Sequence, residues 1–331
     1  MLDKIAVIGD SHVSFFGGNE LVTFIPIIDQ NGRHVGMNNT GDLIENFTTF
    51  HLGGALAYNL EKYGSSNRTR EKIDLLLSNG IIRKGQPILC CFGEVDCRVH
   101  VLRQAESRKV HFKTVVDDIL NNYFSFLLRL RKDHPVYVWG PIPTQKDGSV
   151  INPEVPYYGT EAERNLATAY FNEALEKLCR QCDIQFLSVF RHLVDENNKT
   201  RSEYITDGCH LSQRAWAFAF DEWKSVGVDV KFTPRWYAHS FNLAIECDAR
   251  QLGSLDSTLR AEEIRRFDRI RSKFVVMDVA SKGYVRMGAT NAGGFVMVND
   301  FLNSAAVYDC MDGDDLSWST SLLADLDRGG G

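Results

Sequence analysis

Two short polar stretches, far apart in the sequence, contain the residue types needed for nucleophilic catalysis. Ser11 lies in Gly9-Asp10-Ser11-His12, and an Asp and a His are separated by three positions in Asp207-Gly208-Cys209-His210. An aspartate can accept the Nδ1 proton of an imidazole and leave its Nε2 facing a serine hydroxyl. We therefore take Ser11 as the candidate nucleophile, His210 as the general base and Asp207 as the residue that orients it. Read alone, Gly9–His12 is equally a polar turn that caps the next segment.

The elements around Ser11 place it at the edge of a sheet. Residues 4–8, Lys-Ile-Ala-Val-Ile, form a short apolar run with β-branched side chains, which indicates a buried strand. A Gly-led turn ends this strand, so the next side chains lie at its carboxyl end, where open α/β folds bind their ligands. An exposed serine hydroxyl at such an edge is well placed to act as a nucleophile.

Two further turns have a similar character. Leu52-Gly53-Gly54 follows a short run at 48–52, and Phe92-Gly93-Glu94-Val95-Asp96 follows the apolar stretch 87–91. With the two polar stretches they make four blocks, which in their order resemble those of the SGNH (GDSL-type) hydrolase superfamily over about residues 1–220. The part of the chain beyond residue 220 resembles no family that we recognise.

This resemblance implies a fold and roles for individual residues. The fold is a flavodoxin-like three-layer α/β/α sandwich with a five-stranded parallel sheet. Gly9-Asp10-Ser11 is similar to the nucleophile block, and Asp207 and His210 are similar to the acid–base block. The oxyanion would be bound by the backbone amides of Ser11 and Gly53, or of Gly54 in place of Gly53. We place the neighbouring His12, Glu94 and Asp96 among the substrate-binding residues.

The chain departs from the family at Val95. The family usually has Gly-x-Asn-Asp where this chain has Gly93-Glu94-Val95-Asp96, and the Asn is an oxyanion donor. Valine has no side-chain donor. Arg98, three residues further on, is either a substitute oxyanion donor or a surface arginine paired with Asp96 or Glu94.

The length of 331 residues exceeds one α/β unit of about 200 residues, so we predict two domains. Strands and helices alternate through residues 1–228, which form the SGNH-hydrolase-like domain. An Asn31-Gly32 hairpin is inserted after the first strand. Residues 229–331 contain short apolar runs separated by glycines, with one amphipathic helix near 264–270, and are predicted to form a smaller β-rich domain.

Charge and hydropathy exclude several partners. The net charge is −6 with acidic and basic residues interspersed, so there is no basic stripe for nucleic acid. No segment approaches the roughly 20 apolar residues of a membrane span, and the N-terminus has no long apolar stretch of a signal peptide. We therefore expect a cytoplasmic protein, unless a signal was already removed. The β-rich domain is a candidate surface for a homo-oligomer.

The eight cysteines indicate buried reduced thiols rather than a metal site. Cys179 and Cys182 form a Cys-x-x-Cys, but Cys182 shares an apolar helical face with Phe171 and Leu175. No second pair completes a tetrahedral site, so we expect no metal and no cofactor.

These observations predict a serine esterase that removes O-acyl groups, in particular O-acetyl, from a carbohydrate or another acylated small molecule. A carbohydrate O-acetyltransferase would use the same three residues. A non-catalytic glycan-binding or assembly protein is the alternative from another class: Val95 favours it, whereas Ser11, Asp207 and His210 argue against it.

Overall fold

The computed structural model describes residues 4–19, 24–29, 31–41, 43–148, 156–206 and 208–232, together with four strands between 275 and 308. The chain divides into two compact units, Met1–Lys231 and Phe232–Gly331. Each unit is described by itself.

Five parallel strands form the centre of the first unit. They are β1 (Ile5–Gly9), β4 (Phe47–His51), β5 (Ile88–Cys91), β6 (Val136–Trp139) and β7 (Gln185–Leu187), in the spatial order β4-β1-β5-β6-β7. The first strand in sequence thus lies between the second and the third, which is the flavodoxin-like order. The predicted fold class is confirmed, and the carboxyl ends of β1, β4 and β5 meet at one edge.

A hairpin adds two antiparallel strands to this sheet. Strand β2 (Ile25–Ile28) pairs with β3 (His34–Asn39), and Asn38 of β3 pairs with His51 of β4. The Asp29 carboxylate closes the turn by accepting hydrogen bonds from the amides of Asn31 and Arg33. The sequence predicted the hairpin but not that it would extend the sheet to seven strands.

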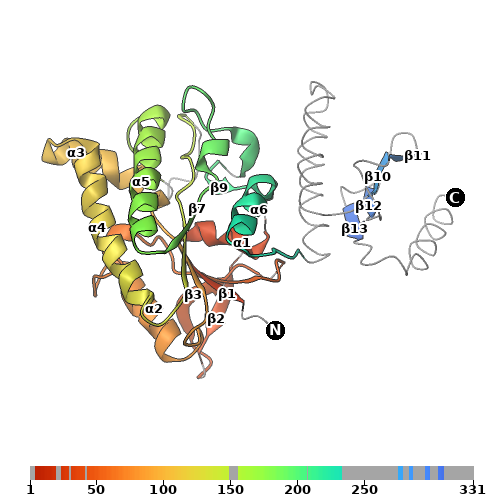
Figure 1. The fold of residues 1–331 in the computed structure, drawn as a ribbon, viewed down its shortest axis with the longest axis horizontal. Coiled ribbons are helices and arrows are strands. Elements are labelled where there is room, and N and C mark those ends of the chain that lie inside the picture. Colours follow the sequence, from red (N-terminus) through yellow and green to blue (C-terminus); the bar gives the residue numbers. More distant parts are fainter. Residues whose placement is uncertain are drawn as a thin grey trace. The chain divides into compact units, whose positions relative to one another are not determined.

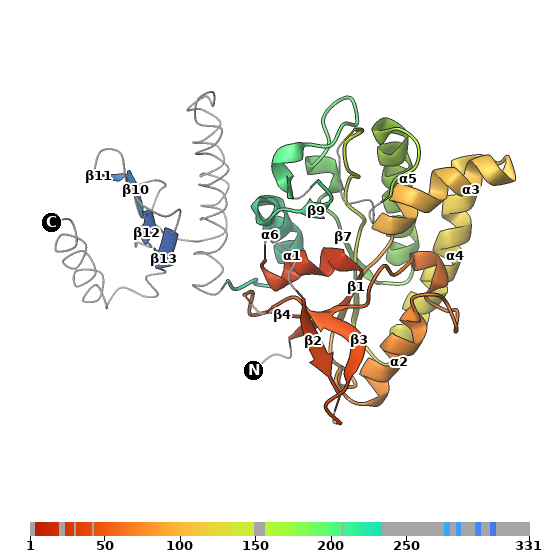
Figure 2. The same cartoon turned by 180° about the vertical axis from the view of Figure 1, so that it is seen from behind.

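Helices cover both faces of the sheet, as Figures 1 and 2 show from opposite sides. Helices α2, α4 and α5 lie on one face, and α1 and α6 lie on the other. The bounds of the helices are α1 Ser14–Gly17, α2 Thr69–Ser78, α3 Val101–Arg108, α4 Phe112–Leu130, α5 Glu161–Gln181 and α6 Trp216–Ser225. Helix α5 begins at a capping box, because the Thr160 side chain accepts from the Glu163 amide and the Glu163 carboxylate accepts from the Thr160 amide.

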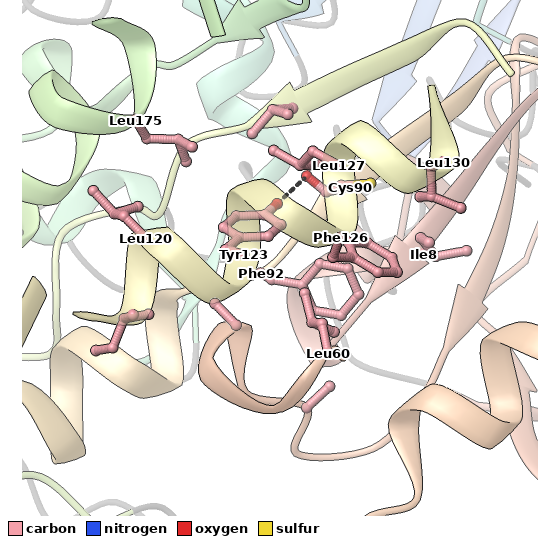
Figure 3. Packing of buried hydrophobic residues seen from close by; sticks show 14 of the residues in the cluster. Ile8, Leu60, Cys90, Phe92, Leu120, Tyr123, Phe126, Leu127, Leu130 and Leu175 are labelled. Carbon is pink, nitrogen blue, oxygen red and sulfur yellow. Dashed lines mark hydrogen bonds between the residues drawn. The ribbon is translucent and has the colours of Figure 1, made fainter. Parts of the chain in front are cut away.

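Helix α4 packs its apolar face on the centre of the sheet (Figure 3). Its buried side chains recur at helical spacing, as the sequence predicted, and include Ile119, Tyr123, Phe126 and Leu130. The Tyr123 hydroxyl donates to the carbonyl oxygen of Cys90 at 3.4 Å, which satisfies the one polar atom of this ring inside the core.

The opposite face of the sheet is covered by aromatic side chains. Phe15 of α1 stacks on Trp216 of α6 with ring centroids 4.7 Å apart, and Phe16 meets Trp139 of β6 edge to face at 5.1 Å. This packing fixes the segment that follows the Ser11 turn against both the sheet and the last helix of the unit.

The structure differs from the predicted elements at two places near the site. The mostly apolar residues after the glycine turn, Ala55–Leu60, predict the start of a helix, but they form only a 3₁₀ turn, Ala57–Asn59. The expected loop Glu94–Arg98 is largely helical, because a π-helical turn, Asp96–His100, continues directly into α3. Asp96 explains the first difference, since its carboxylate accepts the Ala57 and Tyr58 amides.

In the second unit the described strands form a four-stranded sheet in the order β11-β10-β12-β13. Their bounds are β10 Val275–Asp278, β11 Gly283–Val285, β12 Phe295–Val298 and β13 Ala305–Tyr308. The predicted amphipathic helix at 264–270 lies outside the described residues. Hydrogen bonds within the first unit extend as far as Lys231, because its carbonyl oxygen accepts from the Glu45 amide at 2.9 Å. The independence of the two predicted domains remains a prediction.

Among the residues that the structure describes, none of the helices combines the length and the apolar character needed to cross a membrane.

Candidate active site

Ser11 lies immediately beyond the carboxyl end of β1, where it begins the short 3₁₀ turn Ser11–Val13. The Asp10 carboxylate caps this turn by accepting from the His12 amide at 3.0 Å. The hydroxyl of Ser11 lies 2.6 Å from Nε2 of His210. This is the contact that a general base requires in order to take the proton of a nucleophile.

A short hairpin positions His210. Strand β9 (His210–Leu211) pairs antiparallel with β8 (Ile205–Thr206), and Thr206 lies opposite His210. Asp207 follows β8 in the sequence and is outside the described residues. Its proposed role as the residue that orients His210 therefore remains a prediction.

Ser11 and His210 open into one cavity of about 350 Å³. Its wall combines the end of β4, the glycine turn that follows, and the helical segment after β5. The lining residues are Asp10, Ser11, His51, Gly53, Gly54, Val95, Arg98, Val99, His100, Arg103, Pro156, Cys209 and His210. All four sequence blocks thus contribute to the surface around Ser11, the block 92–96 through Val95.

Gly53 can occupy its position only because it has no side chain. Its φ is +88°, and a Cβ atom there would lie 2.5 Å from Oδ1 of Asn67. Asn67 is itself fixed, since its amide nitrogen donates to the Leu52 carbonyl at 2.8 Å. The backbone of residue 53 can therefore lie close to a ligand beside Ser11.

A buried ionic chain runs beneath the cavity. Glu94 receives the Arg98 Nε–H at 2.7 Å through one carboxylate oxygen, and its other oxygen lies 3.1 Å from Nε2 of His12. Arg98 also donates to the Pro156 carbonyl at 2.6 Å. All three ionisable side chains are buried, so the chain links the Ser11 turn, the segment after β5 and residue 156.

The pKa values of this chain favour its charged form. Burial alone would raise the pKa of Glu94, but Arg98 and His12 outweigh it and lower this pKa to about 2. Burial opposes the charge on His12, yet the carboxylates of Asp10 and Glu94 raise its pKa well above the usual value. Glu94 is thus ionised, and its negative charge holds two cations under the cavity.

Asp96 has a structural position rather than the substrate-binding one that we predicted. It is fully buried and does not line the cavity. Its carboxylate accepts from the amides of Ala57 at 2.7 Å and Tyr58 at 3.4 Å, and burial raises its pKa to about 7. His12 and Glu94 are also buried and do not line the cavity, so they act on it from beneath.

Val95 and Arg98 both lie on the cavity wall. Val95 lines the cavity with an apolar side chain. Arg98 lines it too and is paired with Glu94, so the predicted ion pair is present, although the arginine is buried and not on the surface. Its role as an oxyanion donor remains a prediction.

The sequence analysis missed several residues of the cavity. His51 is the last residue of β4, and its ring stacks on Phe24 with centroids 4.1 Å apart. Burial, together with the charges of Lys72, His210 and His12, lowers its pKa to about 4. His100, Arg103 and Cys209 also line the cavity. The sequence does not show that His100, Arg103 and Cys209 lie near Ser11. For His51 it does offer a signal, because this residue lies two positions before Gly53.

One cluster has the composition of a metal site. His12, Cys209 and His210 offer ligand atoms that all lie within 4.8 Å of one another. Two of these side chains already have partners in the arrangement above, since His210 contacts Ser11 and His12 contacts Glu94. We therefore assign the cluster to the acid–base machinery.

The order of the parallel strands and the turns at their carboxyl edge are those of the flavodoxin-like α/β/α fold that the sequence blocks implied. No family model matches the sequence, and no curated protein matches it.

Solved structures similar to this chain include a lipase, an esterase and a domain of Drosophila Oskar. A GDSL-like lipase from Bacteroides thetaiotaomicron is 12% identical with a TM-score of 0.40, and the match covers 68% of this chain and 87% of that chain. An acetylxylan esterase from Geobacillus stearothermophilus is 12% identical with a TM-score of 0.40, covering 68% and 94%. The OSK domain of Drosophila Oskar is 12% identical with a TM-score of 0.40, covering 69% and 90%. The roles proposed below rest on contacts within this chain.

Proposed function

We propose that this protein is a serine esterase that removes O-acyl groups from a small alcohol. The contact of 2.6 Å between Ser11 Oγ and His210 Nε2, inside a cavity of about 350 Å³, is the observation that supports this most directly. A pocket of this size is typical of sites for small ligands.

The reaction proceeds in two steps. Ser11 Oγ attacks the ester carbonyl carbon while His210 takes the hydroxyl proton, and the carbonyl oxygen becomes an oxyanion. The oxyanion accepts hydrogen bonds from the backbone amides of Ser11 and Gly53 and from Arg98. The ester C–O bond then breaks, and His210 returns the proton to the departing alcohol. Water, activated by the same imidazole, releases the acyl group from Ser11 as a carboxylic acid.

Within this proposal we take O-acetyl groups on a carbohydrate as the substrate. The cavity wall supports a polar substrate, because eight of its thirteen residues are Asp, Ser, His, Arg or Cys.

The test is the release of carboxylic acid from a panel of acetylated sugars and small phenyl esters. Ser11→Ala should lower kcat by a factor on the order of 10³–10⁶ without changing the melting temperature. Ser125→Ala, an exposed serine on α4, is the matched control and should keep full activity. Adding a sugar acceptor distinguishes transfer from hydrolysis by product analysis. If Ser11→Ala retains the activity of the unaltered chain, Ser11 is not the nucleophile.

The apolar Val95 favours a second candidate, a protein that binds an acylated glycan without cleaving it. In that case the unaltered chain binds acetylated sugars but releases no acetate, and Val95→Asn creates the activity by restoring a donor. Acetate release by the unaltered chain rules this candidate out.

A further inference from the structure

The charges on the cavity wall are unequal. Its lining contains two arginines, Arg98 and Arg103, and a single carboxylate, Asp10, which is buried at the base of the Ser11 turn. Glu94 lies beneath and offsets the charge of Arg98. Arg103 therefore provides the uncompensated positive charge on this surface.

Arg103 is positioned differently from the other arginine of its helix. It is the third residue of α3, exposed, and on the cavity lining. Within the described part of the chain no carboxylate oxygen lies within 4.0 Å of its guanidinium, and its contact is Nδ1 of His100 at 2.9 Å. Arg108, five residues on, is also exposed but pairs with Asp118 at 2.7 Å. An arginine without an acidic partner, beside a cavity, is free to bind an anion bidentately.

His100 is held in a form that can assist such binding. A guanidinium has no acceptor, so the Arg103 contact requires that Nδ1 of His100 accept, which leaves the proton on Nε2. Burial and the charges of Arg103 and Arg98 lower the pKa of His100. A bound anion would offset the positive charges of Arg103 and Arg98.

We propose that the cavity selects esters that carry an anionic group, a carboxylate or a phosphate, and that Arg103 with His100 binds this group beside Ser11. The inference rests on the proposed esterase function and adds the class of its substrate. Arg103 is a specificity residue here, because it contacts the substrate away from the ester bond.

The experiment uses matched pairs of esters. The anionic 4-acetoxybenzoate and 4-acetoxyphenyl phosphate are compared with the neutral methyl 4-acetoxybenzoate, and 4-nitrophenyl hydrogen succinate with 4-nitrophenyl butyrate. The first set places a carboxylate or a phosphate on the alcohol half, and the second places a carboxylate on the acyl half. For each pair the measured quantity is the ratio of kcat/KM for the anionic ester to that for the neutral one.

Arg103→Gln should lower this ratio by about fivefold for the preferred pair, which is the upper range for an accessible ion pair. Arg108→Gln, the matched control, should leave every ratio unchanged. The wild-type ratio should also fall in 0.5 M salt, because salt screens exposed charges. The pair that responds most identifies carboxylate or phosphate and the half of the ester that bears it.

A binding measurement separates failure of this inference from failure of the proposed function. Calorimetry with the Ser11→Ala protein compares 4-acetoxybenzoate with its neutral methyl ester, without catalysis. If the anion binds more tightly than the methyl ester, and Arg103→Gln removes this difference, the subsite is supported even if the chain hydrolyses none of the esters. Equal binding of the two, or ratios in Arg103→Gln equal to those of the wild type for every pair, overturns it. Hydrolysis that depends on Ser11 but ignores charge would leave the esterase proposal intact.

Discussion

At the scale of single side chains, the cavity depends on a buried network of charges, of which only Arg98 lies on the cavity wall. Glu94 joins Arg98, which reaches the cavity wall, to His12, which follows the nucleophile directly. Removing one member of a buried ion pair typically costs ~3–5 kcal/mol, because the remaining charge stays buried and unpaired. Substitutions here should therefore keep the charge wherever possible.

Arg98 offers a prediction of this kind. If its guanidinium replaces the missing Asn as an oxyanion donor, Arg98→Lys should lower kcat by roughly 10²–10³ with little change in KM, because the contact forms mainly in the transition state. Steady-state kinetics and a melting curve on the same protein check this.

The rescue variant provides the control for Arg98. Val95→Asn in the Arg98→Lys background should restore part of the lost kcat, since it returns the family's donor to the same wall. A fully active Arg98→Lys protein would mean that this arginine acts only through its ion pair with Glu94.

His51 predicts a pH dependence of stability. Its pKa is about 4 in the folded chain against 6.5 as the ordinary value. As the pH falls from 6.5 to 4, the unfolded chain therefore takes up a proton at His51 before the folded chain does, and this lowers the free energy of unfolding. His51→Gln should remove that part of the slope in urea unfolding at pH 7, 6 and 5. His111→Gln, an exposed histidine at the start of α4, should keep the slope; an unchanged slope in His51→Gln would contradict the account.

Some residues of the site can be identified from a sequence motif, and others only from their contacts in the folded chain. Ser11 and His210 were selected from their types and flanking turns, and the structure places them 2.6 Å apart. Asp96 was placed among the substrate-binding residues, but its role is set by the amides of Ala57 and Tyr58, 39 and 38 residues away. Such a contact forms only in the folded chain and leaves no pattern in the sequence around Asp96.

At the scale of the elements, the edge of the sheet depends on the close approach of β1 and β5. A Cβ atom at Gly9 would lie 2.1 Å from the carbonyl oxygen of Cys91, which is backbone and cannot rotate away. The last residue of β1 must therefore be glycine, and the Ser11 turn begins directly after it.

Gly9→Ala should accordingly lower the free energy of unfolding by about 1–3 kcal/mol, through displacement of one strand against the other. Urea unfolding measures this. Gly54→Ala is the matched control, because a Cβ atom there meets nothing within 4 Å and its φ is not in the left-handed region. A stable Gly9→Ala protein would show that the two strands can separate at this edge without cost.

Hydrophobic periodicity predicted the elements that bury a regular face. Helix α4 and the five parallel strands are of this kind, since apolar spacing reflects packing on a flat sheet. The start of the helical segment Asp96–Arg108 was expected as a loop because its first turn is polar. In the folded chain these polar groups are buried in ion pairs and amide contacts. The edge position of the β2–β3 hairpin was also missed, since pairing with β4 is a long-range choice of the chain.

At the scale of the whole molecule, the two units are joined after Lys231. The sequence predicted that the alternation of strands and helices ends near residue 229, within a few residues of Lys231. The Glu45 amide binds the Lys231 carbonyl, and Asn46 binds the Lys231 amide and the Asp229 carbonyl. These bonds attach the last residues of the first unit to the start of β4.

A chain that ends at Lys231 should therefore unfold cooperatively and hydrolyse small esters at the rate of the full chain. A chain that ends at Gly227 lacks the three bonds to Glu45 and Asn46 and should melt at a lower temperature. Thermal denaturation and ester hydrolysis on both chains check this. Failure of the longer one to fold would mean that the second unit contributes to the core of the first.

The most direct test of the account is the reaction of the protein with a serine-directed fluorophosphonate, followed by peptide mass mapping. The account predicts one labelled serine, Ser11, because His210 Nε2 lies 2.6 Å from its hydroxyl and can accept the proton. Ser11→Ala and His210→Gln should lose the label, and His111→Gln should keep it. A label on another serine, or an unlabelled protein that hydrolyses esters, would contradict the claim that Ser11 and His210 form the catalytic pair.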